Sequence, residues 1–118
     1  SIMVTEVVTA STTTSVFEVA QQMARSQISC VVICQPSAIT PAGSLLTPVG
    51  ILTQRDIVRF KKTGLDLVQT PVEAVMSCPL LPVQASDTLW QAYQMMQHHR
   101  IRRLVVLDDA GYLAGIVT

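Results

Sequence analysis

The chain carries one pattern of residues twice, and this internal repeat limits the possible folds more than any other feature. When the sequence is aligned with itself, Met3 falls on Met76 at an offset of 73 residues (76 − 3), and the alignment continues without a gap as far as Cys34. It resumes where Gly50 falls on Gly115, at an offset of 65 (115 − 50), so the first copy has eight additional residues (73 − 65). Two copies of one pattern predict two units built in the same way.

The additional residues lie in the segment 35–48, "QPSAITPAGSLLTP". Proline, glycine and serine interrupt regular secondary structure, and a segment rich in them is typical of a loop. We therefore expect an extended loop between two strands of the first copy.

Each copy has the same predicted order of elements, β-α-β-β-α. Short apolar runs predict strands, a Ser/Thr/Asp cluster predicts a helix N-cap, and apolar residues at helical spacing predict the helix that follows. The predicted strands cover residues 7–9, 30–34 and 49–52 in the first copy and 80–83, 103–107 and 113–117 in the second, and a further helix covers 54–62. The stretch "TPVEAVM" between the copies has the capping-box pattern of a short helix. The expected repeats are residues 1–65 and, with this linker helix, 66–118.

Composition argues against several classes of function. Eight basic and eight acidic residues cancel, so no net charge attracts the chain to nucleic acid or to an anionic membrane. The uncharged stretch 30–53 contains three prolines and cannot form a membrane-spanning helix. The first residues, "SIMVTE", lack the basic and apolar regions of a targeting signal. We expect a cytoplasmic piece of a larger protein that contacts neither nucleic acid nor membrane.

Neither a metal site nor an active site is expected. Cys30, Cys34 and Cys78 form no C-x-x-C pair, and His98 and His99 are neighbours that would point about 100° apart on a helix. The sequence has no nucleophile elbow, glycine-rich phosphate loop or zinc-protease motif. We therefore expect a protein that is no enzyme and has no cofactor.

Thr53 and Asp56 stand at the predicted start of the helix 54–62, and two interpretations fit them. In the structural one, the Thr53 hydroxyl caps the helix and Asp56, in the first turn, complements the helix dipole. In the functional one, the helix start and the hydroxyl bind a phosphate, while the carboxylate accepts both hydroxyls of a ribose. The same geometry serves both.

Three stretches together resemble one family. They are "EAVM" before the second copy, "IRRLVVLDDAGYLAGIVT" at the end of the chain, and "GILTQRDIVRF", which fits a pattern of Gly, two apolar residues, Thr or Ser, two variable residues and Asp. In their order and duplication they resemble a tandem pair of CBS (cystathionine-β-synthase) domains, a Bateman module. The resemblance implies an α+β fold in which two β-α-β-β-α repeats pack sheet to sheet about a pseudo-two-fold axis. It also implies that the second repeat stops before its last helix, because the chain ends at Thr118.

The resemblance further implies a set of ligand-binding residues. In CBS pairs that bind adenosine nucleotides, the positions equivalent to Thr53 and Asp56 hold phosphate and ribose, and apolar strand residues flank the base. Carried over to this chain, Val8, Ala10 and Ile51 would flank the adenine. The regulatory ligand that we expect is AMP, ADP or ATP.

Arg102 and Arg103 begin a predicted strand of the second copy. A neutral explanation is that arginines at a strand edge extend to water. In nucleotide-binding members of the family, basic residues at the matching place reach phosphates between the repeats, and the planar guanidinium suits that role. Thr118 is the counterpart of Thr53 but lacks a following Asp in this chain. We therefore expect at most one tightly bound nucleotide per chain.

The resemblance leaves two functional interpretations. In the first, the module senses adenosine nucleotides and controls an attached output domain. In the alternative, it binds no ligand and acts as an interaction or dimerisation module of a larger signalling, transport or metabolic protein. Thr53, Asp56 and the arginine pair favour the first.

An apolar stripe on the predicted helix that starts near Ser86 bears on assembly. Its members are Leu89, Trp90, Tyr93 and Met96. Trp90 and Tyr93 are interpreted as core or interface residues. Because the stripe is wider than one short sheet covers, we expect a homodimer that buries part of it.

Overall fold

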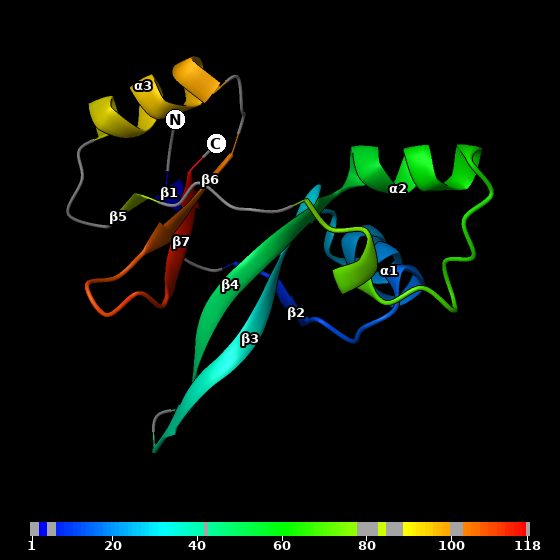
Figure 1. Ribbon diagram of the computed structural model, residues 1–118, viewed down its shortest axis with the longest axis horizontal. Coiled ribbons are helices and arrows are strands. Elements are labelled where there is room, and N and C mark those ends of the chain that lie inside the picture. Colours follow the sequence, from blue (N-terminus) through cyan, green and yellow to red (C-terminus); the bar gives the residue numbers. More distant parts are fainter. Residues whose placement is uncertain are drawn as a thin grey trace. The chain divides into compact units, whose positions relative to one another are not determined.

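The computed structural model describes residues 3–4, 7–41, 43–77, 83–84, 89–99 and 103–117. Its elements follow in the order β1 (Met3–Val4), β2 (Thr9–Ser11), α1 (Val16–Ser26), β3 (Cys30–Thr40), β4 (Gly43–Thr53), α2 (Gln54–Lys62), the 3-10 helix η1 (Val72–Ala74), β5 (Val83–Gln84), α3 (Leu89–His99), β6 (Leu104–Leu107) and β7 (Leu113–Val117) (Figure 1). Two mixed sheets occur with these helices, so the fold is α+β, as predicted. Among the helices described, none is long and apolar enough to cross a membrane.

The chain divides into two compact units. Unit A consists of Val8–Gln35 and Val49–Pro79, and unit B consists of Ser1–Val7, Pro36–Pro48 and Leu80–Thr118. Unit A holds most of the first copy and also residues 66–79, which the repeat assigns to the second. Unit B holds the rest of the second copy and two segments of the first, Ser1–Val7 and Pro36–Pro48. The boundary between the repeats at residues 65 and 66 stays a prediction.

Each copy is preceded by a short lead-in segment, residues 3–4 for the first copy and 76–77 for the second, and each segment contacts a strand of the other copy. In unit B, β1 pairs antiparallel with β7 and places Val4 opposite Ile116. In unit A, Ser77 forms an antiparallel bridge with Ile51, with N–H···O distances of 3.0 and 3.3 Å. The two pairings are equivalent, since Ser77 corresponds to Val4 (77 − 4 = 73) and Ile116 to Ile51 (116 − 51 = 65). Each lead-in segment therefore completes the sheet of the other copy.

A glycine permits this close pairing in unit A. A Cβ atom on Gly50 would overlap the Met76 side chain and lie 2.6 Å from its Cγ, so no larger residue fits without movement. In the sequence, Gly115 and Met3 hold the matching positions of the second copy. The repeated Met and Gly are thus explained, in unit A, by a contact between the lead-in segment and β4.

Unit A has its core between a three-stranded sheet, in the order β2-β3-β4, and the helices α1 and α2. Ser15 caps α1 by accepting the Glu18 N–H at 3.1 Å, which confirms the predicted polar N-cap. The helix predicted over 54–62 is α2. The buried core residues are Val16, Val19, Met23, Val31, Ile33, Leu52, Ile57, Phe60 and Val72.

Unit B contains a four-stranded sheet in the order β1-β7-β6-β5, and α3 packs on it through Ala92 and Met96. The two residues interpreted as core or interface residues are exposed: Trp90 is 64% exposed and Tyr93 is 46% exposed. Their rings stack on each other with centroids 5.8 Å apart. The core interpretation of this pair is wrong, because the small Ala92 and the flexible Met96 already fill the contact with the sheet.

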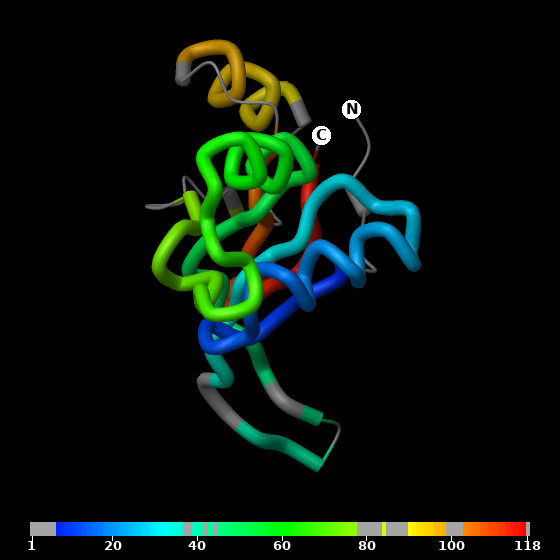
Figure 2. Tube along the Cα trace, turned by 90° about the vertical axis from the view of Figure 1, so that its right-hand side faces the viewer, coloured from blue at the N-terminus to red at the C-terminus, as the bar shows by residue number. Residues whose placement is uncertain are grey.

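The loop predicted over 35–48 is instead a long β-hairpin, since β3 continues to Thr40 and β4 starts at Gly43 (Figures 1 and 2). Its prolines occupy places that a strand tolerates. Pro36 lies beyond the part of β3 that pairs with β2, and Pro48 lies in the outer strand β4. At the turn, Gly43 has φ of 127°. A loop was predicted because the content of proline, glycine and serine takes no account of where in a strand these residues lie.

The predicted capping box of the linker helix is also wrong. The N-cap of η1 is Pro71, which makes no side-chain hydrogen bond, and the Thr70 hydroxyl donates to the Asp66 carbonyl at 2.6 Å. Backbone bonds attach this segment to unit A instead, including one from Val72 N–H to the Thr14 carbonyl at 2.8 Å. The linker therefore belongs structurally to the unit that precedes it.

Candidate ligand-binding site

Five of the predicted ligand-binding residues lie in unit A, on β2, β4 and the start of α2. Val8 directly precedes β2, Ala10 lies within it, Ile51 and Thr53 belong to β4, and Asp56 is in the first turn of α2. Strands β2 and β4 are both neighbours of β3. Since β4 runs directly into α2, the last strand residue and the first helical turn form one continuous segment.

Thr53 and Asp56 form a complete capping box at the start of α2. The Thr53 hydroxyl oxygen accepts the Asp56 N–H at 3.2 Å, and the Asp56 carboxylate oxygen Oδ2 accepts the Thr53 N–H at 2.9 Å. Each bond satisfies a backbone donor that the helix itself leaves unpaired. The structural interpretation of this pair is therefore confirmed.

The second carboxylate oxygen of Asp56 is paired with Arg59. The distance from Arg59 Nη2 to Asp56 Oδ1 is 3.1 Å, and the Asp56 side chain is 11% exposed while that of Arg59 is 63% exposed. The Arg59 guanidinium also lies 5.4 Å from the centroid of the Phe60 ring. Arg59 was not among the predicted site residues, although a spacing of three residues on a helix brings opposite charges together.

The two remaining backbone N–H groups at the start of α2 differ in their hydrogen bonding. Gln54 N–H donates to the Ser29 carbonyl at 2.9 Å, whereas Arg55 N–H has no hydrogen-bond partner in the described part of the chain. One backbone donor therefore remains at the positive end of the helix dipole.

The capping box leaves further bonding capacity on both side chains. The Thr53 oxygen accepts one bond, and its own O–H can still donate. Each Asp56 oxygen accepts one bond and has room for a second. The helix start can thus offer two donors, from Thr53 and Arg55, and two acceptor positions on Asp56.

The apolar residues of the predicted site differ in their surroundings. Val8 and Ala10 are partly buried and pack against the core of unit A. Ile51 alternates along β4 with Leu52, which is fully buried in that core, so Ile51 faces the other side of the sheet. Only the partly exposed surface of these residues remains to contact a ligand.

The predicted residues of the second copy lie partly outside the described structure. Arg103 directly precedes β6 in unit B and is half-buried. Arg102 and Thr118 lie outside the described residues. A phosphate-binding role for the arginine pair stays a prediction.

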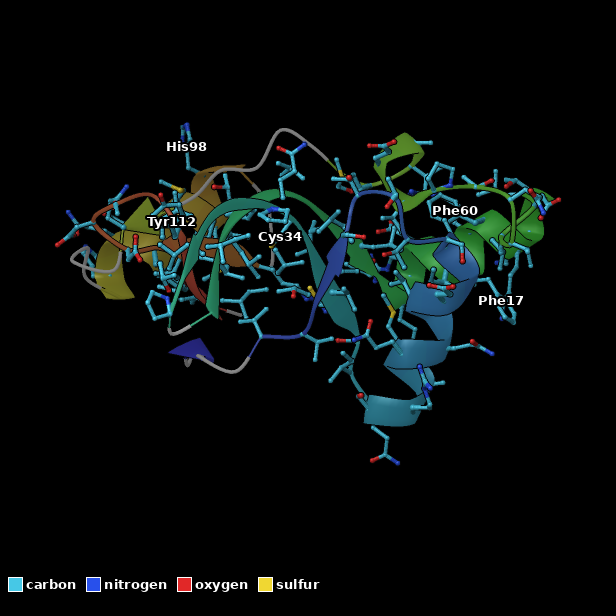
Figure 3. All side chains as sticks on the ribbon, turned by 90° about the horizontal axis from the view of Figure 1, so that it is seen from below. Phe17, Cys34, Phe60, His98 and Tyr112 are labelled. Atoms are coloured by element: carbon cyan, nitrogen blue, oxygen red, sulfur yellow. The ribbon has the colours of Figure 1, made fainter. Side chains whose placement is uncertain are left out.

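Cys34 lies on β3 (Figure 3) and is 3% exposed. Burial raises the pKa of its thiol to about 11. A thiol with such a pKa stays protonated and weakly nucleophilic near neutral pH. Cys34 is therefore a buried thiol of low reactivity, on the face of β3 opposite to the core residue Ile33.

Two equivalent α+β units with exchanged lead-in segments and a polar helix start define a tandem-repeat module. The family model described as the CBS domain matches residues 1–62 and 72–118. The chain belongs to the CBS domain family and contains two such domains in tandem, as the sequence analysis predicts.

Relatives share most of the chain. It is 34% identical over 116 residues to the CBS domain-containing protein YhcV of Bacillus subtilis, with 98% of the chain and 75% of that protein covered. It is 32% identical over 114 residues to the uncharacterized protein MK0525 of Methanopyrus kandleri, covering 96% of the chain and 54% of that protein, so it spans about half of this relative's length. A solved structure, the CBS domain protein PAE2072 of Pyrobaculum aerophilum complexed with AMP, is similar with a TM-score of 0.78 and 27% identity over 95% of this chain and 79% of that one.

Proposed function

We propose that this CBS pair is a regulatory module that binds an adenosine nucleotide at the start of α2 in unit A. The observation that carries the proposal is the capping box, which holds the Thr53 hydroxyl and the Asp56 carboxylate together. Beside them is the Arg55 N–H, which has no hydrogen-bond partner among the described residues. The AMP complex of the related PAE2072 structure supports the ligand class.

Each group has a role that its chemistry permits. The two acceptor positions on Asp56 bind the ribose hydroxyls, and the Thr53 O–H and the Arg55 N–H donate to a phosphate. Partly exposed surface of Val8, Ala10 and Ile51 contacts the base. Arg102 and Arg103 add bidentate phosphate contacts, and Thr118 occupies the matching place in the second domain. The proposed roles of Arg102, Arg103 and Thr118 rest only on the repeat and on the family resemblance.

The proposed mechanism is conformational and not catalytic. A nucleotide can change an attached output domain only if it binds one conformation of the module more tightly than another. The module then transmits occupancy and performs no reaction of its own. Its host and output domain are part of this proposal, since the chain spans only part of MK0525.

A second candidate is a dimerisation module without a ligand. Two observations favour it: the capping box is satisfied by the protein alone, and α3 exposes the stacked Trp90 and Tyr93 rings. A homodimer that buries this pair is compatible with nucleotide binding at α2, so the two functions are tested separately.

Calorimetric titration of the chain with AMP, ADP, ATP and S-adenosylmethionine tests the ligand class. We expect at least one of the three nucleotides to bind more tightly than S-adenosylmethionine, because the sulfonium carries no phosphate and brings a positive charge toward the arginines. Binding of S-adenosylmethionine alone would contradict the phosphate role of Arg102 and Arg103. No binding of any of them at millimolar concentration would favour the dimerisation module.

A further inference from the structure

The carboxylate of Asp56 is held by two donors, one before it and one after it in the chain. The Thr53 N–H, at the end of β4, donates to Oδ2 at 2.9 Å. The Arg59 guanidinium, three residues further along α2, donates to Oδ1 through Nη2 at 3.1 Å. The first bond belongs to the capping box, whereas the second does not. The bond from Arg59 therefore has no part in capping the helix.

The capping bond by itself does not fix the plane of the carboxylate. The last side-chain torsion of an aspartate, which turns the carboxylate about the Cβ–Cγ bond, has a broad energy minimum. A single hydrogen bond on Oδ2 thus leaves Oδ1 able to move. The bond from Arg59 restrains Oδ1 separately, and a turn of the carboxylate would lengthen at least one of the two bonds. Together the two donors fix where both oxygens lie.

The guanidinium of Arg59 is itself supported by the core of unit A. Its Cζ atom lies 5.4 Å from the centroid of the Phe60 ring, within the range of a cation–π contact. Phe60 is 9% exposed and belongs to the buried core of the unit. A side chain that is largely exposed is therefore held in place by a ring that is not.

We propose that Arg59 is a positioning residue for ribose recognition, which holds the Asp56 carboxylate so that each oxygen accepts one ribose hydroxyl. This role rests on the nucleotide site proposed above at Asp56. The two hydroxyls of a ribose are on adjacent carbon atoms and on the same face of the ring, so they match two acceptors at a fixed spacing. A carboxylate that is fixed before binding loses less conformational freedom when the ribose binds.

A positioning role has a different signature from the two other roles of a helical arginine. If Arg59 only stabilises α2, its loss changes the melting transition and leaves nucleotide affinity unchanged. If its charge attracts the phosphate, its loss weakens all nucleotides alike, with or without ribose hydroxyls. If it positions Asp56, its loss weakens only the nucleotides that carry those hydroxyls.

Calorimetric titration of the full chain with AMP and with dideoxy-AMP, in which hydrogen replaces both ribose hydroxyls, separates the three roles. Arg59→Met, which removes the donor, is expected to lower the affinity for AMP about three- to tenfold and that for dideoxy-AMP less than about twofold. Arg59→Lys supplies one charged donor and is expected to bring AMP affinity back to within about threefold of the wild type. Lys62→Met is the matched control, since it removes an exposed positive charge from the same helix, and is expected to change AMP affinity less than about twofold.

A double variant keeps the test decisive if dideoxy-AMP binds too weakly to be titrated. In the background of Asp56→Asn, which is expected to weaken AMP by itself, adding Arg59→Met is expected to change AMP affinity less than about twofold further, because Arg59 acts through the carboxylate. A further loss as large as in the wild-type background would show that Arg59 acts independently of Asp56.

Three results would overturn the positioning role: unchanged AMP affinity in Arg59→Met, equal losses for AMP and dideoxy-AMP, and equal effects of Arg59→Met and Lys62→Met. Each of them leaves the nucleotide site standing, provided that the wild type binds AMP and Asp56→Asn weakens it. No binding of AMP by the wild type would instead refute the site and the positioning role together.

Discussion

Single residues at the start of α2 serve stability and the proposed binding at once. Thr53 and Asp56 cap the helix with bonds of 3.2 and 2.9 Å and still have hydrogen-bonding capacity left. Their spacing could be read from the sequence because a capping box is a local motif. The burial of Asp56 and the core packing of Val8 and Ala10 could not, because they depend on residues distant in the sequence.

The thiol of Cys34 gives a prediction at this scale. Because its pKa is raised from 9.0 to about 11 by burial, the folded chain keeps the proton where the unfolded chain loses it. The stabilising effect is complete below pH 9 and is lost as the pH rises through 11. The free energy of unfolding should fall by at most about 1.4 kcal/mol per pH unit in this window, and Cys34→Ala should remove that part of the slope.

Alkylation provides a second measurement of the same thiol. At pH 8, iodoacetamide should leave Cys34 unmodified in the native chain and modify it in urea, as determined by peptide mass spectrometry. Equal rates in the two states, or an alkaline stability slope that Cys34→Ala leaves unchanged, would contradict the burial argument.

At the scale of elements, the strands predicted over 30–34, 49–52, 103–107 and 113–117 were readable from apolar runs, but their pairing was not. The strand predicted over 7–9 lies at Thr9–Ser11, and residues 80–82 of the strand predicted over 80–83 lie outside the described residues. The sequence predicts β6 and β7 closely, whereas β1 and the exchange of lead-in segments were missed. A two-residue strand has no periodicity, and its partner lies more than 100 residues away (117 − 3 = 114). The hairpin of β3 and β4 was missed because prolines were counted without regard to which strand edge they occupy.

Because the lead-in segments are exchanged, a substitution or deletion in one of them should destabilise the unit whose sheet that segment joins. Deleting residues 1–4 should raise amide hydrogen exchange of β7 in unit B, because Val4 pairs with Ile116 there. Ser77→Pro should raise exchange of β4 in unit A, because it removes the N–H that donates to the Ile51 carbonyl at 3.0 Å. The two variants are controls for each other. If each change instead acted on the unit of its own copy, the exchanged pairing would be refuted.

At the scale of the whole molecule, the exposed aromatic pair of α3 predicts self-association. Replacing Trp90 and Tyr93 by serine should shift a dimer toward monomer in light scattering at tens of micromolar, because two large apolar rings would no longer be buried at the interface. Val68→Ser is the matched control, since Val68 is 58% exposed and lies in unit A. A wild-type monomer at this concentration would count against the homodimer.

The central claim is that an adenosine nucleotide binds at Asp56, and one calorimetric comparison tests it most directly. AMP is titrated into the wild-type chain, Asp56→Asn and Asp66→Asn. Both variants exchange a carboxylate for an amide that can still accept a backbone N–H, as Asp56 does from Thr53 and Asp66 does from Val68. About one AMP per chain is expected for the wild type, with affinity about ten- to a hundredfold lower in Asp56→Asn and within about twofold in Asp66→Asn. Unchanged affinity in Asp56→Asn with an intact melting transition would place the nucleotide elsewhere and contradict the account.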